Sequence, residues 1–189
     1  ASQITALVIG ISISTALNYH DVFELQLGQD GEITQDGYFR RFIPDIDNAV
    51  KPDEESRDLY SRHINDESSP FVYLPLPDLL KKIIKTIPAR KFTSNSKVVD
   101  LYDSPVNDNS ELVKDFIHKL NSIYGQRFNT NRISCQLKQY VKSIENDPCL
   151  TYALFGRPEQ NAPTAFYYRS ITLGRLVSIY KKLSEEYFK

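Results

Sequence analysis

Helical spacing of apolar residues from Ser110 to the C-terminus is the feature that most constrains the fold. Three stretches there repeat apolar side chains every three or four residues, which is the period that places them on one face of an α-helix. These positions are Leu112, Val113, Phe116, Ile117, Leu120 and Ile123, then Ile133, Leu137, Tyr140, Val141 and Ile144, then Leu173, Leu176, Val177, Tyr180 and Leu183. A short helix over 149–155, followed by Gly156 in the C′ position, is expected before the last stretch. The sequence therefore predicts mostly helix over 110–185.

The N-terminal half combines helices with short strands. Residues 4–17 carry apolar side chains at helical spacing, and Asn18 is expected to stop that buried helix. Alternating or extended patterns predict strands at 23–27, 32–34, 38–43 and 71–74. A polar, acidic excursion with a short helix near 54–63 separates the last two strands, and a helix opens after Pro77. The fold class is therefore α+β, mostly helical with a small antiparallel β-meander, in a single domain over 1–189.

Composition is that of an ordinary globular protein, with 41% hydrophobic and 25% charged residues. The net charge is −1, but residues 1–110 carry −6 and residues 111–189 carry +5. A basic C-terminal half is compatible with a phosphate-binding face, and equally with a solvated surface. Cys135 and Cys149 lack metal-ligand spacing and fall in apolar helical contexts, which favours reduced thiols and a cytoplasmic location. The apolar run at 4–17 is too short to span a membrane.

Two adjacent tyrosines, Tyr167 and Tyr168, lie between a proline-marked loop and the last helix. Arginines are near them in the sequence: Arg157, Arg169 and, two helices earlier, Arg132. A tyrosine can attack phosphorus when its neighbours favour the phenolate, and arginines can clamp the phosphate. The alternative is that both rings pack in the core while their hydroxyls reach water. No glycine-rich phosphate loop or His/Cys cluster is present, so no cofactor and no metal are expected.

Four sequence segments, in order along nearly the whole chain, resemble the catalytic domain of the tyrosine recombinases, the phage-integrase family. The stretch at 9–17 is similar to the helix that carries the family's first arginine, and the meander follows where the family has its small sheet. Residues 73–77 look like the family's last strand entering the next helix. Residues 131–141, 154–157 and 164–170 resemble its second-arginine helix, its Leu-Gly-His turn and its terminal tyrosine.

Several signature residues of that family are absent. Ser12 stands at the place of the first catalytic arginine, and the His-x-x-Arg phrase falls on Asn131-Arg132-Ile133-Ser134. Arg157 replaces the histidine of the turn, and Lys51 is the tentative match for the sheet lysine. The tyrosine matches plainly as Tyr168, with Tyr167 as the other choice.

The resemblance implies a metal-free strand transfer on double-stranded DNA within a mobile element, as in DNA integration and recombination. Tyr168 or Tyr167 would attack the phosphodiester, Arg157 and Arg132 would hold the phosphate, and Arg169, Lys138 and Arg175 would bind DNA. It also implies a homo-oligomer on DNA, weak binding by this chain alone, and a DNA-clamping domain upstream of Ala1.

Three hypotheses remain open at this point. The chain is an active, divergent recombinase, a non-catalytic DNA- or protein-binding module of the same fold, or a helical protein-interaction module whose tyrosines belong to the core. A basic face, and the convergence of Arg132, Arg157 and Tyr168, distinguish these hypotheses.

Overall fold

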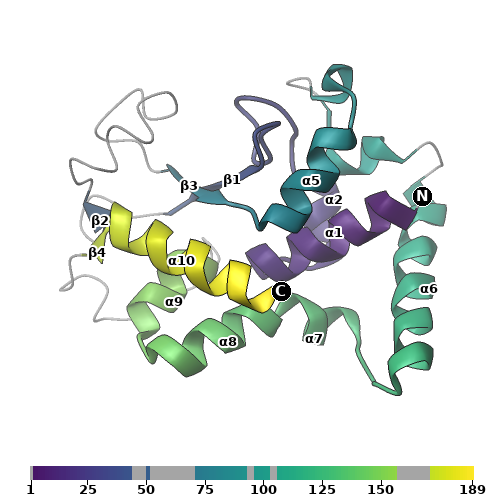
Figure 1. Cartoon of the computed structure of the whole chain (residues 1–189). Coiled ribbons are helices and arrows are strands. Elements are labelled where there is room, and N and C mark those ends of the chain that lie inside the picture. Colours follow the sequence, from purple (N-terminus) through teal and green to yellow (C-terminus); the bar gives the residue numbers. More distant parts are fainter. Residues whose placement is uncertain (1, 44–49, 52–70, 93–95, 103–105, 157–170) are drawn as a thin grey trace.

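The computed structural model describes residues 2–43, 50–51, 71–92, 96–102, 106–156 and 171–189. These residues form a mostly helical α+β fold with a small antiparallel sheet (Figure 1). The elements are α1 (Ser2–Thr15), α2 (Tyr19–Glu24), β1 (Tyr38–Phe42), β2 (Val50–Lys51), β3 (Phe71–Pro75), α5 (Asp78–Thr86), the 3₁₀ turns η1 (Ala89–Lys91) and η2 (Val98–Leu101), α6 (Val106–Tyr124), α7 (Thr130–Ser134), α8 (Gln136–Glu145), α9 (Pro148–Phe155), β4 (Ile171–Thr172) and α10 (Leu173–Tyr187). Over these ranges, no helix combines the length and apolar character that a membrane crossing requires.

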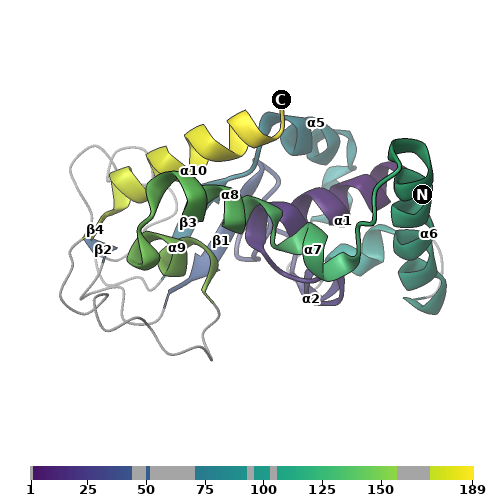
Figure 2. The ribbon, with the colours of Figure 1, turned by 90° about the horizontal axis from the view of Figure 1, so that it is seen from below.

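Helix α1 is the central element and confirms the buried helix predicted over 4–17. It contacts α2, α5, α6, α7 and α8, which surround it in Figures 1 and 2. Leu7 and Ile11 are at most 1% exposed, as expected of a helix that is apolar around most of its circumference. Gly10 allows α5 to pack closely, since a Cβ at this position would lie 2.3 Å from Leu80 Cδ2.

The strand predicted at 23–27 is wrong: α2 includes Phe23 and Glu24, and Gln26 and Leu27 form only isolated bridges. Asn18, which the apolar pattern predicts as the end of α1, is the N-cap of α2, and its side chain accepts a hydrogen bond from Asp21 N at 3.0 Å. Helix α1 has already ended at Thr15, and Ala16 adopts a left-handed φ of 57°. An asparagine cap satisfies a backbone N–H that a helix start leaves free. The capping preference of Asn18 therefore outweighs the short apolar–polar alternation at 23–27, which predicts a strand.

The antiparallel sheet pairs β1 with β3, which confirms two of the predicted strands. Its register runs from Tyr38 opposite Pro75 to Phe42 opposite Phe71. The strand predicted at 32–34 is reduced to isolated bridges at Ile33. In the described part of the chain the meander is therefore smaller than predicted, with two paired strands and a bridged loop.

A parallel pair that the sequence pattern does not predict joins β2 to β4. Val50 lies opposite Ile171, and Lys51 lies opposite Thr172. This contact connects the middle of the chain to the residues that precede α10. Strands of two residues are too short to show any periodicity in the sequence. The helix predicted near 54–63 lies outside the described residues.

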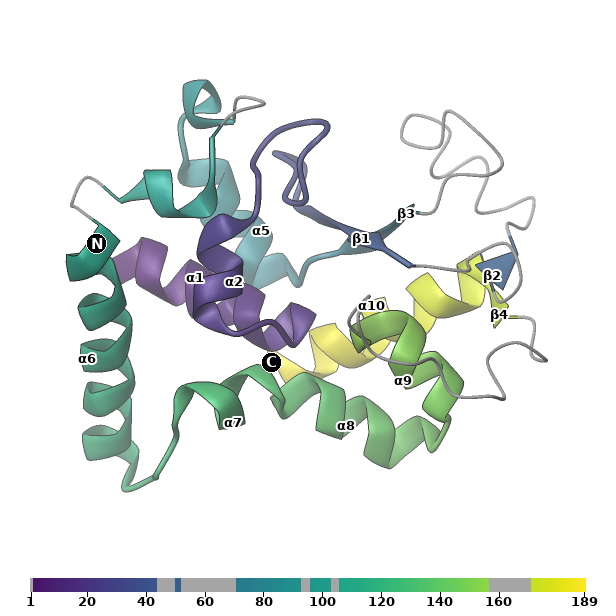
Figure 3. The same cartoon turned by 180° about the vertical axis from the view of Figure 1, so that it is seen from behind.

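The helices predicted over 110–185 are confirmed wherever the structure describes that range. Helix α6 stands at the end of the molecule opposite β4 and α9, and α7, α8 and α9 follow one another along one side (Figures 1 and 3). Ile123 and Ile144, at the ends of two predicted apolar stripes, are nevertheless 71% and 49% exposed. Both lie in the last turn of their helix. Both cysteines are free thiols, with Cys149 buried as predicted and Cys135 only half-buried.

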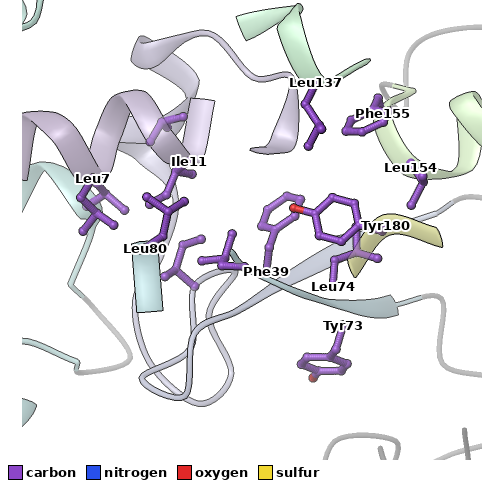
Figure 4. Packing of buried hydrophobic residues seen from close by; sticks show 14 of the residues in the cluster. Leu7, Ile11, Phe39, Tyr73, Leu74, Leu80, Leu137, Leu154, Phe155 and Tyr180 are labelled. Atoms are coloured by element: carbon purple, nitrogen blue, oxygen red, sulfur yellow. The ribbon is translucent and has the colours of Figure 1, made fainter. Parts of the chain in front are cut away.

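Tyr180 anchors the last helix to the first. Its side chain reaches from α10 into the core beside Leu74 and below Leu137 (Figure 4), and it is fully buried. The hydroxyl donates a hydrogen bond to Ser14 O, near the end of α1, at 3.1 Å. Burial raises the pKa of Tyr180, so the phenol keeps the proton that it donates.

Replacing Tyr180 by Phe should lower the free energy of unfolding by about 1–2 kcal/mol, because the Ser14 carbonyl loses its donor in a buried site. Urea denaturation followed by circular dichroism measures the loss. Tyr187→Phe is the matched control on the same helix, because its half-buried hydroxyl donates a longer bond of 3.3 Å to Gln136 Oε1. The control should lose only about 0.5 kcal/mol. Equal losses in the two variants would contradict the anchoring role of Tyr180.

Candidate functional site

The segment that carries the predicted nucleophile is not among the described residues. Tyr167, Tyr168, Arg157 and Arg169 all fall within 157–170, so their predicted roles stay predictions. The structure does place both ends of that segment. It leaves α9 at Gly156 and returns at Ile171, the first residue of β4.

The helix before this segment confirms the prediction at 149–155, but its end differs from the expected one. Gly156 has a φ of −66°, so it does not adopt the left-handed conformation that commonly places glycine after a helix. Close packing explains the glycine instead, because a Cβ there would lie 2.5 Å from Tyr152 Cδ2 and 2.7 Å from Tyr152 O. Any larger residue at 156 would displace the tyrosine ring or the helix end.

Two serines occupy the positions at which the recombinase resemblance expects arginines. Ser12 is 2% exposed, and its hydroxyl donates to Leu17 O at 2.5 Å. Ser134 is 4% exposed, and its hydroxyl donates to Asn131 O at 3.1 Å. Both hydroxyls therefore complete the hydrogen bonding of nearby backbone carbonyls. The helices that carry them, α1 and α7, pack against each other.

Of the predicted basic residues that are described, Arg132 and Arg175 are exposed. Arg132 is exposed on α7, and its Nη1 donates to Arg127 O at 3.4 Å. Arg175 is exposed in the first turn of α10, where its amide donates to the N-cap hydroxyl of Thr172. Lys138 is half-buried on α8. Lys51, the tentative match for the sheet lysine, lies in β2 beside β4.

Arg41 is a buried cation that the sequence analysis did not identify. It lies on β1, is 7% exposed, and donates from Nε to Ala153 O at 2.8 Å and from Nη2 to Gly156 O. Both acceptors belong to the C-terminal end of α9, where carbonyls lack partners within the helix and the helix dipole is negative. Arg41 thus holds the residue from which the 157–170 segment departs.

The charge on Arg41 persists under physiological conditions. Burial lowers its pKa to about 10, an effect that the nearby phenols of Tyr152 and Tyr180 oppose. The sequence did contain a signal for this residue. Phe39 and Ile43 are the buried neighbours two residues away on the same strand face, so the alternation directs Arg41 into the core as well.

No metal-binding site is evident in the part of the chain that the structure describes. No three or more His, Cys, Asp or Glu side chains there come close enough together to hold an ion. The features that the described residues bring together are the buried serines of α1 and α7, the Arg41 contact with α9, and surface cations on α7, α8 and α10.

Replacing Arg41 by Met should lower the free energy of unfolding by about 2 kcal/mol, because two buried carbonyls of α9 lose a charged donor. Arg40→Met is the control one residue away on the opposite strand face, where the guanidinium lies 3.7 Å from the centre of the Phe71 ring. That control should lose about 1 kcal/mol or less. Chemical denaturation gives both values, and amide hydrogen exchange should quicken in α9 for Arg41→Met. Unchanged exchange in α9 would contradict the assigned contact.

A scan against protein-family models, a search of curated proteins and a search of solved structures each found no match to this chain. The relationship to the tyrosine recombinases therefore remains a hypothesis drawn from the residues, and the geometry above is what a proposed function has to accommodate.

Proposed function

We propose that this chain is a DNA-binding domain similar to the catalytic domains of tyrosine recombinases, in which the phosphate clamp for strand transfer has been lost. One observation carries the proposal. Ser12 and Ser134 stand where that resemblance expects the two catalytic arginines, and both are buried and hydrogen-bonded to backbone carbonyls.

The packing of α1 against α7 supports the resemblance itself. Two arginines that hold one phosphate must come from helices that lie close together, and Ser12 and Ser134 are carried by two such helices. A central buried helix, a small sheet and a helical C-terminal half also occur in the order that the resemblance implies.

The missing arginines have a large energetic consequence. A serine hydroxyl donates one hydrogen bond and carries no charge, whereas a guanidinium offers a charged, bidentate fork. Removing one preorganised donor of this kind typically lowers a rate by about 10²–10³. Two such losses correspond to roughly 5–8 kcal/mol if they add. A tyrosine, with a pKa of about 10 in water, would then lack most of the charge that activates it.

DNA binding does not need that clamp, because it depends on surface cations. Residues 111–189 carry a net charge of +5, and Arg132 and Arg175 in this half are exposed. Cations that neutralise phosphates release counterions from duplex DNA, which makes the affinity depend steeply on salt. This is the physical basis of the proposed binding.

A second candidate function is residual strand transfer by Tyr168. The observation in its favour is the sequence of the 157–170 segment, which contains Arg157, Tyr168 and the adjacent Arg169. Arg132, exposed on α7 two residues before Ser134, is the described residue that would supply further positive charge. In this case Tyr168 attacks the phosphodiester to form a 3′-phosphotyrosine, and the deoxyribose 5′-oxygen leaves.

Labelled duplex DNA should bind this chain weakly at about 50 mM salt, and the affinity should fall steeply as salt rises, because counterion release drives the association. Fluorescence anisotropy measures the dissociation constant at several salt concentrations. Arg175→Ala should weaken binding and lower the slope of log K against log[salt] by about 0.9. Arg90→Ala, which removes an exposed arginine from the acidic half, should change neither. Absence of binding at low salt would favour the protein-interaction hypothesis.

A nicked duplex that traps covalent intermediates should yield little or no phosphotyrosine adduct with this chain, because the arginine clamp is missing. Denaturing gel electrophoresis of labelled DNA detects the adduct. An adduct that is lost in Tyr168→Phe and kept in Tyr167→Phe would establish the second candidate function and overturn the proposed loss of chemistry. An adduct that persists in Tyr168→Phe would instead identify a different nucleophile.

A further inference from the structure

A shallow cavity lies between α8 and α9, two helices that pack side by side (Figures 1 and 2). Its volume is about 200 Å³. The described residues that line it are Lys138, Lys142, Pro148, Thr151, Tyr152 and Gly156. The cavity therefore borders the glycine from which the 157–170 segment departs.

Two lysines give this cavity a positive rim. Lys138 and Lys142 are four residues apart on α8, so they share one face of the helix. Within the part of the chain that the structure describes, neither ammonium forms an ion pair or a hydrogen bond. Two like charges beside one concave surface repel each other, and an anion placed between them would relieve that repulsion.

The carboxylate of Asp147, next to the cavity wall in the sequence, is engaged in capping α9. Asp147 precedes Pro148, but its carboxylate is 6% exposed and accepts hydrogen bonds from the amides of Cys149 and Leu150 at 3.0 and 3.3 Å. Asp147 thus serves as the N-cap of α9. The Cys149 and Leu150 amides of α9 are therefore occupied, and the two lysines are the charged donors among the described lining residues.

The floor of the cavity is apolar. Pro148 and the half-buried ring of Tyr152 belong to its lining, and lysine side chains in such a wall commonly add apolar surface through their aliphatic stems. The close contact of Gly156 with the Tyr152 ring holds this wall in place. A cavity with two cations at its rim and an apolar floor suits a ligand that combines a phosphate with a compact, weakly polar body.

We infer that this cavity binds one nucleotide unit, a phosphate ester together with its sugar or base. A volume of about 200 Å³ is smaller than the roughly 300–1,000 Å³ of pockets for complete drug-sized ligands, which restricts the occupant to a single unit. The source of the unit is either a free mononucleotide or one residue of a DNA strand. The second source rests on the proposed DNA-binding function, and the first does not.

Titration of the ¹⁵N-labelled chain with thymidine 5′-monophosphate tests the site without DNA. Saturable shifts are expected in the amides of α8 and α9. Lys138→Ala/Lys142→Ala should weaken binding at least about tenfold, because two charge-assisted contacts are lost. Lys82→Ala/Lys85→Ala removes the same charge from α5, which lies on the other side of the molecule (Figure 3), and should leave binding unchanged. Lys142→Gln is a milder variant that should still weaken binding should the double variant fail to fold.

Two further probes separate the phosphate from the rest of the nucleotide. Thymidine without phosphate should bind much more weakly than the monophosphate, and inorganic phosphate should shift the same amides with lower affinity. No saturable shift in α8 and α9, or equal binding by thymidine and its monophosphate, would overturn the site.

Measuring duplex-DNA binding by the same variants tells whether the cavity proposal or the proposed DNA-binding function is wrong. Weaker duplex binding by the α8 double variant than by the α5 double variant identifies the DNA strand as a source of the occupant. If the chain binds the monophosphate but not duplex DNA, the cavity is a site for free nucleotides and the proposed DNA-binding function is wrong. Duplex binding without monophosphate binding rejects the cavity alone.

Discussion

The contact between Arg41 and the C-terminal end of α9 is the interaction on which much of the architecture depends. A guanidinium on β1 is buried, and its charge is compensated by two carbonyls that the helix itself leaves without partners. Desolvating a cation is costly, so the pairing persists only while β1 and α9 keep their mutual position. The sheet therefore fixes where Gly156 lies, and with it the point from which the predicted nucleophile segment departs.

The remaining elements are organised around α1. Because α1 is apolar on most of its surface, several helices bury their own faces against it at the same time. Tyr180 adds a polar contact by donating to Ser14 O, close to the left-handed residue Ala16 that ends the helix. The first and last helices are thus joined through a hydrogen bond between residues far apart in the sequence. In this arrangement Ser12 lies in the packed interior, where it caps a backbone carbonyl and is closed to ligands.

The positively charged residues that bear on the proposed function fall into two groups, one buried in the fold and one on the helices α7, α8 and α10. The interior cation, Arg41, maintains the fold, whereas Arg132, Arg175 and Lys142 are exposed and Lys138 is half-buried. Binding to a phosphate backbone requires only such outward charges. Strand transfer also requires preorganised charges around one phosphate, and the buried serines do not provide them. Under the proposed function, the outward charges would hold a nucleic acid, and the buried serines would not activate its phosphate.

The sequence alone determined the helical C-terminal half, the buried first helix and the strands β1 and β3, because long apolar periods and short extended runs report local geometry directly. The sequence named Arg132, Lys138 and Arg175 as phosphate- or DNA-contacting residues only through the family resemblance, and those roles stay predictions. Tertiary structure decided the rest. The helix at 19–24 depended on the cap at Asn18. The β2–β4 pair joins residues more than a hundred positions apart, and no local sequence pattern predicts such a contact. The burial of Arg41 and the cavity beside Lys138 and Lys142 also depend on how helices and strands pack together. Packing supplies the partners that decide whether a buried charge or an unpaired carbonyl can be tolerated.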